Sequence, residues 1–423
     1  MKYHKRILKN GLTIIEVPSN DAESVVVDFF VRTGSRNETK KENGISHFLE
    51  HFLFKGTKKF PTAMAITELI DGIGGEMNAN TGKEHTQFYI KGHHSHLSLI
   101  FEVLTDMIQN PLMNKVELEK EKGVIVEEIN MYRDNPRATV GNILEEIMWE
   151  GDPLARDIAG TPEIVKKFTR QMFLSYMERH YQMGNMLLGI SGKYDRAVLN
   201  QLINKYWSKK PSKRYQKWTK AKDNQRASRL RLQYKDTQQA HFNLGFKGYK
   251  MSDKKNAAAA VLSAILGGGM SSRLFSEIRE RRGLAYYVRA SNSSYQDTGV
   301  FNVSAGVRTT SIEEAIQVTL DVLRNIANTP IPEREIVKAK AFLKGHTTLY
   351  LEDNQARLDW YLEQAAFKKD LKSPAEILKK VDDVTAKQVQ AVAAELFQAN
   401  KMSLAIIGPY KGDAKFKKII SKF

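Results

Sequence analysis

Cysteine is absent from this sequence of 423 residues, so disulfides and thiolate metal sites are excluded. Any metal ligand must come from His, Asp, Glu or the backbone. Long apolar runs are also absent, because the longest nearly apolar stretch, 257–270, has 14 residues and is too short to span a bilayer. The basic N-terminal stretch lacks the apolar core of a secretory signal. We therefore expect a cytoplasmic protein without membrane insertion.

The net charge of +17 raises the question of a nucleic-acid partner. Lysines are spread along the whole chain, and the densest basic cluster, 209–222, falls where a linker is expected. No nucleic-acid-binding motif accompanies it. We interpret the charge as a property of the surface and expect no nucleic-acid partner.

The segment His47-Phe48-Leu49-Glu50-His51 carries two imidazoles and a carboxylate within five residues. The pattern around it predicts a helix over 44–55, with Asn43 as N-cap and Gly56 as the stop. Positions i, i+3 and i+4 share one face of a helix, so His47 and His51 can bind one metal beside Glu50. The order H-x-x-E-H is the inverzincin signature. The alternative is a pair of core histidines bonded to backbone carbonyls, but the correctly placed glutamate favours a metal site.

A catalytic zinc usually takes three protein ligands, so one more donor is expected elsewhere. The best candidates lie on a helix predicted over 116–131, where Glu121 and Glu128 are two turns apart on one face. Glu127 points about 100° away from Glu128. The two glutamates are flanked by Val124, Ile125 and Ile129. These apolar neighbours predict that this face of the helix points inward. A solvated charged face is the alternative, and it suits Glu117 and Glu119 better.

The two motifs together, His47-x-x-Glu50-His51 and Glu121-x6-Glu128, resemble the pitrilysin/insulinase family of zinc peptidases, in its bacterial processing-peptidase-like branch. Further matches are Phe54-Lys55-Gly56-Thr57, Asn78-Ala79-Asn80-Thr81, Ser272-Arg273-Leu274-Phe275 and Gly283-Leu284-Ala285-Tyr286, so the resemblance covers essentially the whole chain. It implies one Zn²⁺ per chain held by His47, His51 and Glu128. It also implies that Glu50 is the general base and Glu121 a carboxylate just outside the ligand sphere.

The resemblance implies roles for residues away from the metal motif. Arg279 and Tyr286 have the Arg-x6-Tyr spacing with which family members contact substrate near the metal. Tyr287 is a rival for Tyr286, and a surface arginine with a packed tyrosine is the alternative interpretation. Asn78 and Ala79 match the family's edge strand, to which an extended substrate adds through main-chain hydrogen bonds.

The chain repeats itself at a constant offset of 216 residues. The segment 185–194 parallels 401–410, with shared Met, Leu, Ile, Gly and Tyr positions. We therefore expect a catalytic zinc-binding domain over 1–208, a basic linker over 209–225, and a homologous domain over 226–423 that lacks the metal motif and closes the active-site cavity. The expected fold is α+β, with helices packed on one face of a mostly antiparallel sheet in each domain, the two forming a clamshell.

The function implied is a zinc metalloendopeptidase that hydrolyses unstructured peptides enclosed between the two domains. The alternative is a non-catalytic peptide-binding or scaffold subunit of the same fold. Mitochondrial processing peptidases carry acidic residues where this chain has Ala138 and Asn142, so their arginine specificity is not expected here. As partners, the resemblance implies peptide substrates and a second copy or a related subunit, that is, a homodimer or a mixed pair.

A second histidine cluster lies at His93-His94-Ser95-His96. It has no carboxylate at a useful spacing in its own segment, and we interpret it as solvated polar surface that binds adventitious metal.

Overall fold

The computed structural model describes residues 2–215 and 218–423, and Gln216 and Lys217 of the predicted linker lie outside the described residues. The chain forms two compact units. The first comprises 1–130, 156–219 and 350–371, and the second comprises 131–155, 220–349 and 372–423. Across the described residues, every helix is too short or too polar to cross a membrane.

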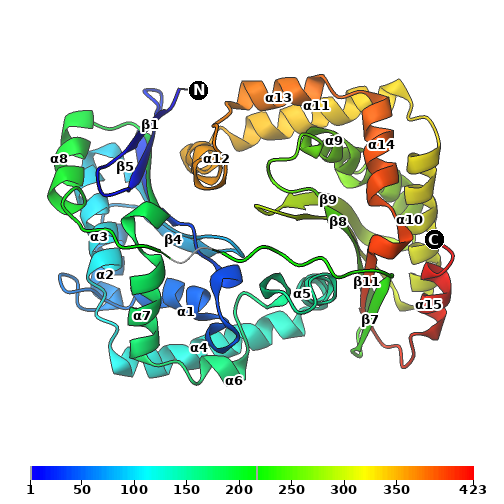
Figure 1. Cartoon of the computed structure of the whole chain (residues 1–423), viewed down its shortest axis with the longest axis horizontal. Helices are drawn as coiled ribbons and strands as arrows, with labels where there is room; N and C mark the ends of the chain where they lie inside the picture. The colour runs from blue at the N-terminus through cyan, green and yellow to red at the C-terminus, as the bar shows by residue number, and fades with distance from the viewer. Residues whose placement is uncertain (1, 216–217) are drawn as a thin grey trace. The chain divides into compact units, whose positions relative to one another are not determined.

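The first unit is built on a six-stranded sheet with the order β1-β2-β6-β3-β5-β4 (Figure 1). Only β2 and β6 run parallel, and the other neighbours are antiparallel, which confirms a mostly antiparallel sheet. The strands are β1 (His4–Ile7), β2 (Thr13–Pro18), β3 (Ser24–Val31), β4 (Glu76–Thr81), β5 (Thr86–His93) and β6 (Met186–Gly192).

Helices cover both faces of this sheet. One face packs with the metal-motif helix and its neighbours in a single apolar core that includes Val27, Phe29, Phe48 and Phe88. The helices of the first unit are α1 (Ile45–Leu53), α2 (Ala63–Asp71), α3 (Leu97–Gln109), α4 (Lys115–Asp134, which ends in the second unit), α6 (Pro162–Val165), α7 (Arg170–His180), α8 (Arg196–Tyr206) and α12 (Asn354–Phe367).

The second unit repeats the same strand arrangement, and its described residues contain no counterpart of β1. Its sheet has the order β7-β11-β8-β10-β9, which matches β2-β6-β3-β5-β4, and again only one neighbouring pair, β7 and β11, is parallel. The strands are β7 (Arg229–Tyr234), β8 (Gln239–Gly248), β9 (Ala285–Ser294), β10 (Gly299–Arg308) and β11 (Met402–Gly408). This shared topology supports the duplication that the sequence predicts.

The second unit also has a buried core between its sheet and its helices. The helix α9 lies where the sequence predicts the counterpart of the His-bearing helix. The helices of this unit are α5 (Pro136–Met148), α9 (Asn256–Gly267), α10 (Ile312–Asn328), α11 (Glu333–Tyr350, whose last residue falls in the first unit), α13 (Pro374–Asp382), α14 (Ala386–Leu396) and α15 (Ala414–Ile420), with a π-helix, η6, over Phe275–Glu280.

Each sequence half supplies a helix to the compact unit formed mainly by the other half. Helix α12 covers the outer face of the first sheet, where Leu358 and Leu362 lie so close to β6 that a Cβ at Gly189 would be 2.9 and 2.8 Å from them. Helix α5 covers the outer face of the second sheet and meets it at Gly245 in the same way. The expectation of helices on one sheet face is therefore incomplete, because periodicity shows that a helix has an apolar stripe but not which sheet it covers.

Candidate metal centre

Helix α1 carries the motif, and its start differs from the prediction. The N-cap is Gly44, with φ of 96°, rather than Asn43. The buried carboxylate of Glu38 accepts hydrogen bonds from the backbone N–H groups of Gly44 (2.8 Å) and Ser46 (2.9 Å), and so satisfies donors that an N-cap side chain usually serves. The side chain of Asn43 instead donates to Glu38 and to the Asp157 carbonyl.

The end of α1 is also earlier than predicted. The helix ends at Leu53 with Phe54 as its C-cap, and Gly56, with φ of 122°, follows two residues later. Within the helix, the flanking apolar side chains are buried, whereas His47, Glu50 and His51 are half-buried on one face. The predicted placement of the two imidazoles and the carboxylate on one side of a turn is thus what the helix shows.

Helix α4 brings the two predicted glutamates to this face. An oxygen of Glu128 lies 3.6 Å from Nε2 of His47, and its other oxygen lies 3.4 Å from Nε2 of His51. Glu121 contacts His51 from behind, with Oε1 at 2.9 Å from Nδ1. Glu127 is exposed, which agrees with its predicted direction away from Glu128. Glu117 and Glu119 form ion pairs with lysines of their own helix, which agrees with a solvated face.

One prediction for α4 is wrong in part. Ile125 and Ile129 are buried, but Val124 is 51% exposed. Val124 lies between Glu121 and Glu128 on the ligand face, and this face is partly open to solvent, whereas the isoleucines point into the core on the adjacent stripe.

The donor set fits a divalent cation. One atom each from His47, His51 and Glu128 lies within 4.8 Å of the others. Bonds of about 2.0–2.1 Å in a tetrahedral zinc site put neighbouring donors about 3.3 Å apart, close to the separations seen here. Oε2 of Glu128 is buried without a hydrogen-bond partner, so a cation would satisfy it.

The charges around the site favour ionised carboxylates. The nearby imidazole of His47 is the main cause that lowers the pKa of Glu128. Burial raises the pKa of Glu121, but the hydrogen bonds from His51 and Lys55 outweigh it, so the pKa is lowered overall. Burial lowers the pKa of His47, yet Glu128 and Glu50 outweigh that effect and raise it. An excess of negative charge therefore faces the two imidazoles.

The fourth motif residue, Glu50, is tied to the neighbouring strand. Its Oε2 accepts a 2.5 Å hydrogen bond from the hydroxyl of Thr81 at the end of β4. In the described part of the chain, β4 pairs only with β5, so it is an edge strand of the sheet, as predicted for Asn78 and Ala79. The general-base candidate thus sits beside an open strand edge.

Arg279 and Tyr286 lie in the second unit, on η6 and β9, and contact each other there. An Nη of Arg279 donates to the Tyr286 carbonyl at 2.7 Å, and the Tyr286 side chain is 72% exposed. Tyr287, the rival, has its hydroxyl 3.1 Å from Nδ1 of His241 and its ring under Arg137. The roles of Arg279 and Tyr286 stay predictions.

Three residues of the site have no predicted role. Lys55 forms a 2.7 Å ion pair with Glu121, Thr81 orients Glu50, and Glu38 caps α1. Lys55 lies one helical turn after His51, so its spacing was a usable signal. Nothing in the sequence pairs Thr81 or Glu38 with the motif helix.

Comparison with known proteins places the chain in one family. Residues 14–162 match the family model described as insulinase (peptidase family M16), and residues 167–343 match the one described as the peptidase M16 inactive domain. The metal motifs lie in the first stretch. The second includes α9, which carries no histidine or glutamate.

Relatives of known sequence are similar over nearly their whole length. An uncharacterized zinc protease of Streptomyces coelicolor is 33% identical, covering 96% of this chain and 89% of that protein. An uncharacterized zinc protease of Bacillus subtilis is 32% identical, covering 95% and 97%.

Two solved structures share the fold. A protease from Helicobacter pylori has a TM-score of 0.90 at 23% identity, covering 96% of this chain and 99% of that one. A Pseudomonas fluorescens structure described as a peptidase M16 inactive domain has a TM-score of 0.89 at 18% identity, covering 97% and 99%. By its sequence relatives and both matching family models, the chain belongs to peptidase family M16, the insulinase family.

Proposed function

We propose that this protein is a zinc-dependent metalloendopeptidase that hydrolyses unstructured peptides, with Glu50 as the general base. The observation that carries the proposal is the convergence of His47, His51 and Glu128 on one point, beside a glutamate held at a strand edge. Both relatives are named as uncharacterized zinc proteases, and these names support the same class.

His47, His51 and Glu128 would hold the metal, one ion per chain. Bound zinc would supply a Lewis acid that lowers the pKa of water to about 7. Glu50 accepts the proton of the attacking water and passes it to the leaving amine. The hydrogen bond from Thr81 fixes one oxygen of Glu50, which keeps the other oxygen available for the proton.

The open edge of β4 supports an extended substrate. A peptide that adds beside Asn78 and Ala79 through main-chain hydrogen bonds lies next to the strand that holds Glu50. Main-chain pairing selects for an unfolded backbone and depends little on side chains. We therefore propose that these two residues bind substrate and that folded proteins are poor substrates.

Arg279 and Tyr286 complete the proposal. Tyr286 donates its hydroxyl to the oxyanion that develops on the substrate carbonyl, and Arg279 holds a substrate carbonyl. The exposure of Tyr286 supports its choice over Tyr287, whose hydroxyl already has a partner.

The test compares wild type with Glu50→Gln, which keeps the side-chain shape and the oxygen that accepts from Thr81. Both proteins are expected to contain one zinc per chain by elemental analysis, and only wild type is expected to cleave a quenched, unfolded peptide. Glu127→Gln is the matched control on the exposed side of α4 and should cleave like wild type. Peptide cleavage by metal-free wild type after chelation would contradict the proposal.

The same experiment separates the alternative, a non-catalytic peptide-binding or scaffold subunit. That alternative predicts peptide binding without hydrolysis in wild type as well as in Glu50→Gln. A cytoplasmic location stays a prediction. Assembly as a homodimer or with a related subunit also stays a prediction, and light scattering of the purified chain would measure whether it forms a homodimer.

A further inference from the structure

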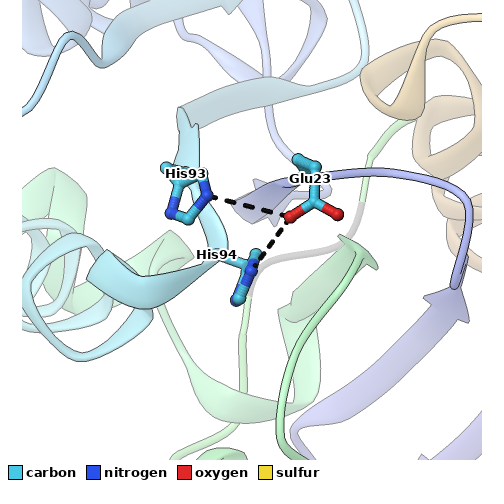
Figure 2. A group of neighbouring side chains, drawn as sticks. All are labelled: Glu23, His93 and His94. Atoms are coloured by element: carbon cyan, nitrogen blue, oxygen red, sulfur yellow. Dashed lines mark ion pairs between the residues drawn. The ribbon is translucent and has the colours of Figure 1, made fainter.

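A second group of possible metal ligands lies at one end of the first sheet. Glu23 immediately precedes β3, His93 ends β5, and His94 begins the short 3-10 helix that follows. Figure 2 shows both imidazoles directed toward one oxygen of Glu23. The histidine segment alone has no carboxylate at a useful spacing, but the neighbouring strand supplies one.

The backbone holds these residues together. Ser24 pairs with His93 in the antiparallel ladder, and the N–H of His94 donates to the Glu23 carbonyl at 3.0 Å. Behind them, Gly192 has φ of 97°, and a Cβ there would lie 2.1 Å from the Ser24 carbonyl oxygen. The ends of β3, β5 and β6 therefore pack closely, and the ligand positions do not depend on a free loop.

The geometry is close to that of the catalytic cluster. Oε2 of Glu23 lies 3.2 Å from Nε2 of His94 and 3.8 Å from Nε2 of His93, and the three donor atoms fall within 4.8 Å of one another. The separation expected between donors of a tetrahedral zinc ion is about 3.3 Å. The longer distance must shorten by about 0.5 Å for zinc to bind both donors, and both of these side chains are more than half exposed.

A hydrogen bond orients one of the imidazoles. Nδ1 of His93 lies 2.8 Å from the hydroxyl of Ser95. Nδ1 also accepts a hydrogen bond from the backbone N–H of Ser95 at 3.4 Å. These contacts occupy Nδ1 and leave Nε2, which faces Glu23, as the ring nitrogen for a metal ion; an outer partner of this kind usually orients a metal-binding histidine.

We propose that Glu23, His93 and His94 form a second Zn²⁺ site, separate from the catalytic cluster. Two imidazole nitrogens and one carboxylate oxygen are the ligands that zinc, nickel and copper favour, and a water completes the coordination. The site is independent of the proposed peptidase function. It joins β3 to β5, two neighbouring strands of the first sheet.

Lys193 competes for the carboxylate. Its Nζ lies 2.9 and 3.0 Å from the two oxygens of Glu23, so zinc must displace it from at least one of them. The side chains of Glu23 and His93 are 67% and 51% exposed. Zinc therefore binds here more weakly than at the catalytic cluster, and it exchanges with solvent. An exposed ion pair of this kind changes an affinity by about two- to five-fold.

The test counts zinc ions. Full-length protein that already holds its catalytic zinc is titrated with more zinc by calorimetry. A second equivalent with micromolar affinity is expected, and it should disappear in His94→Ala and in Glu23→Gln. Peptide cleavage at one zinc per chain should be unchanged in both variants.

Two controls sharpen the result. His96→Ala should keep the second equivalent, because the His96 ring is 6.4 Å from that of His93 and outside the ligand group. Lys193→Met should bind the second zinc about two- to five-fold more tightly, because the competing cation is gone. Loss of the second equivalent in His96→Ala, or unchanged affinity in Lys193→Met, would contradict the assignment.

The outcome does not depend on the catalytic site. A His51→Ala chain, impaired at the catalytic cluster, should still bind a zinc that the additional His94→Ala change removes. A wild-type chain that binds only one zinc, or a second zinc only at millimolar concentration, would overturn the proposal.

Discussion

Glu121 fixes the orientation of His51 by accepting a hydrogen bond from Nδ1 over 2.9 Å. A carboxylate can only accept, so Nδ1 carries the proton and the lone pair of Nε2 faces Glu128. Lys55 holds the other oxygen of Glu121 at 2.7 Å. Glu121 and Lys55 therefore orient the His51 ring for a metal ion, although neither of them is among the three proposed metal ligands.

Replacing Glu121 by Gln should weaken zinc binding by about 10- to 100-fold, because partners of ligating histidines contribute to affinity on that scale. Competition with a fluorescent chelator measures the change. Glu119→Gln, on the solvated face of the same helix, is the control and should bind zinc like wild type. Equal affinities for Glu121→Gln and wild type would mean that the Glu121 bond does not orient the ring.

Two adjacent glutamates of α4 should behave differently. Glu128→Gln removes the carboxylate that faces both histidines and should reduce zinc to well below one per chain after dialysis. Glu127→Gln, whose side chain is exposed, should leave the zinc content unchanged. Elemental analysis of the two purified variants measures their zinc content. The reverse result would mean that Glu127 is the ligand.

Tyr286→Phe should lower kcat with little change in KM, because the hydroxyl is proposed to act on the oxyanion alone. The expected loss is about 10²- to 10³-fold, the usual effect of removing one oxyanion donor. Tyr287→Phe should leave kcat intact and lower the Tm slightly, since its hydroxyl contacts His241. Steady-state kinetics on an unfolded peptide distinguishes the two tyrosines, and a kcat loss confined to Tyr287→Phe would exchange their roles.

Gly44→Ala should destabilise the first unit, because the start of α1 requires a left-handed residue there. A Cβ at Gly44 would lie 2.5 Å from the Ala159 carbonyl oxygen, and φ is 96°. The conformation alone costs about 1–2 kcal/mol for a residue with a side chain.

The controls for Gly44→Ala separate conformation from contact. Gly74 also has positive φ, 61°, but open space around its Cβ position, so Gly74→Ala should show the conformational cost alone. Gly123→Ala, inside α4 with nothing within 4 Å, should stabilise by about 0.5–1 kcal/mol. Thermal melts measure all three. A Tm for Gly44→Ala no lower than for Gly74→Ala would show that the contact with Ala159 relaxes freely.

Stability should fall in mild acid partly through His180. Burial lowers the pKa of this 1% exposed histidine from 6.5 to about 4. The folded state therefore keeps it neutral, while the unfolded chain takes up a proton below pH 6.5. Its contribution is complete above pH 6.5 and is lost as pH falls toward 4, by up to about 3 kcal/mol. His180→Gln should show a shallower loss of Tm between these pH values, and equal slopes would contradict the assignment.

The candidate metal centre could be predicted because its parts are local. His47, Glu50 and His51 share one turn, and Glu121 and Glu128 share one face of a second helix, so helical geometry alone groups them in two sets. How the two helices are aligned against each other depends on the tertiary structure. The prediction that both sets bind one metal ion therefore came from the family resemblance.

The parts that were missed depend on long-range pairing. Glu23 reaches His94 only because β3 and β5 pair with Ser24 opposite His93, and the sequence contains no mark of that register. The choice of Asn43 as N-cap was wrong for a related reason. The side chain of Glu38 already accepts a hydrogen bond from the first turn of α1, so the cap residue needs no acceptor side chain. The cap position is instead occupied by Gly44 in a left-handed conformation.

Helix α12, which the second half of the sequence supplies to the first unit, also affects the order of folding during synthesis. The outer face of the first sheet exposes Ile15, Val26 and Phe30 to water until residues 354–367 have left the ribosome and covered them. The strands that need this cover are all made by residue 192. The first unit therefore cannot complete its core until most of the chain has been made, and the uncovered apolar face is prone to aggregation in the meantime.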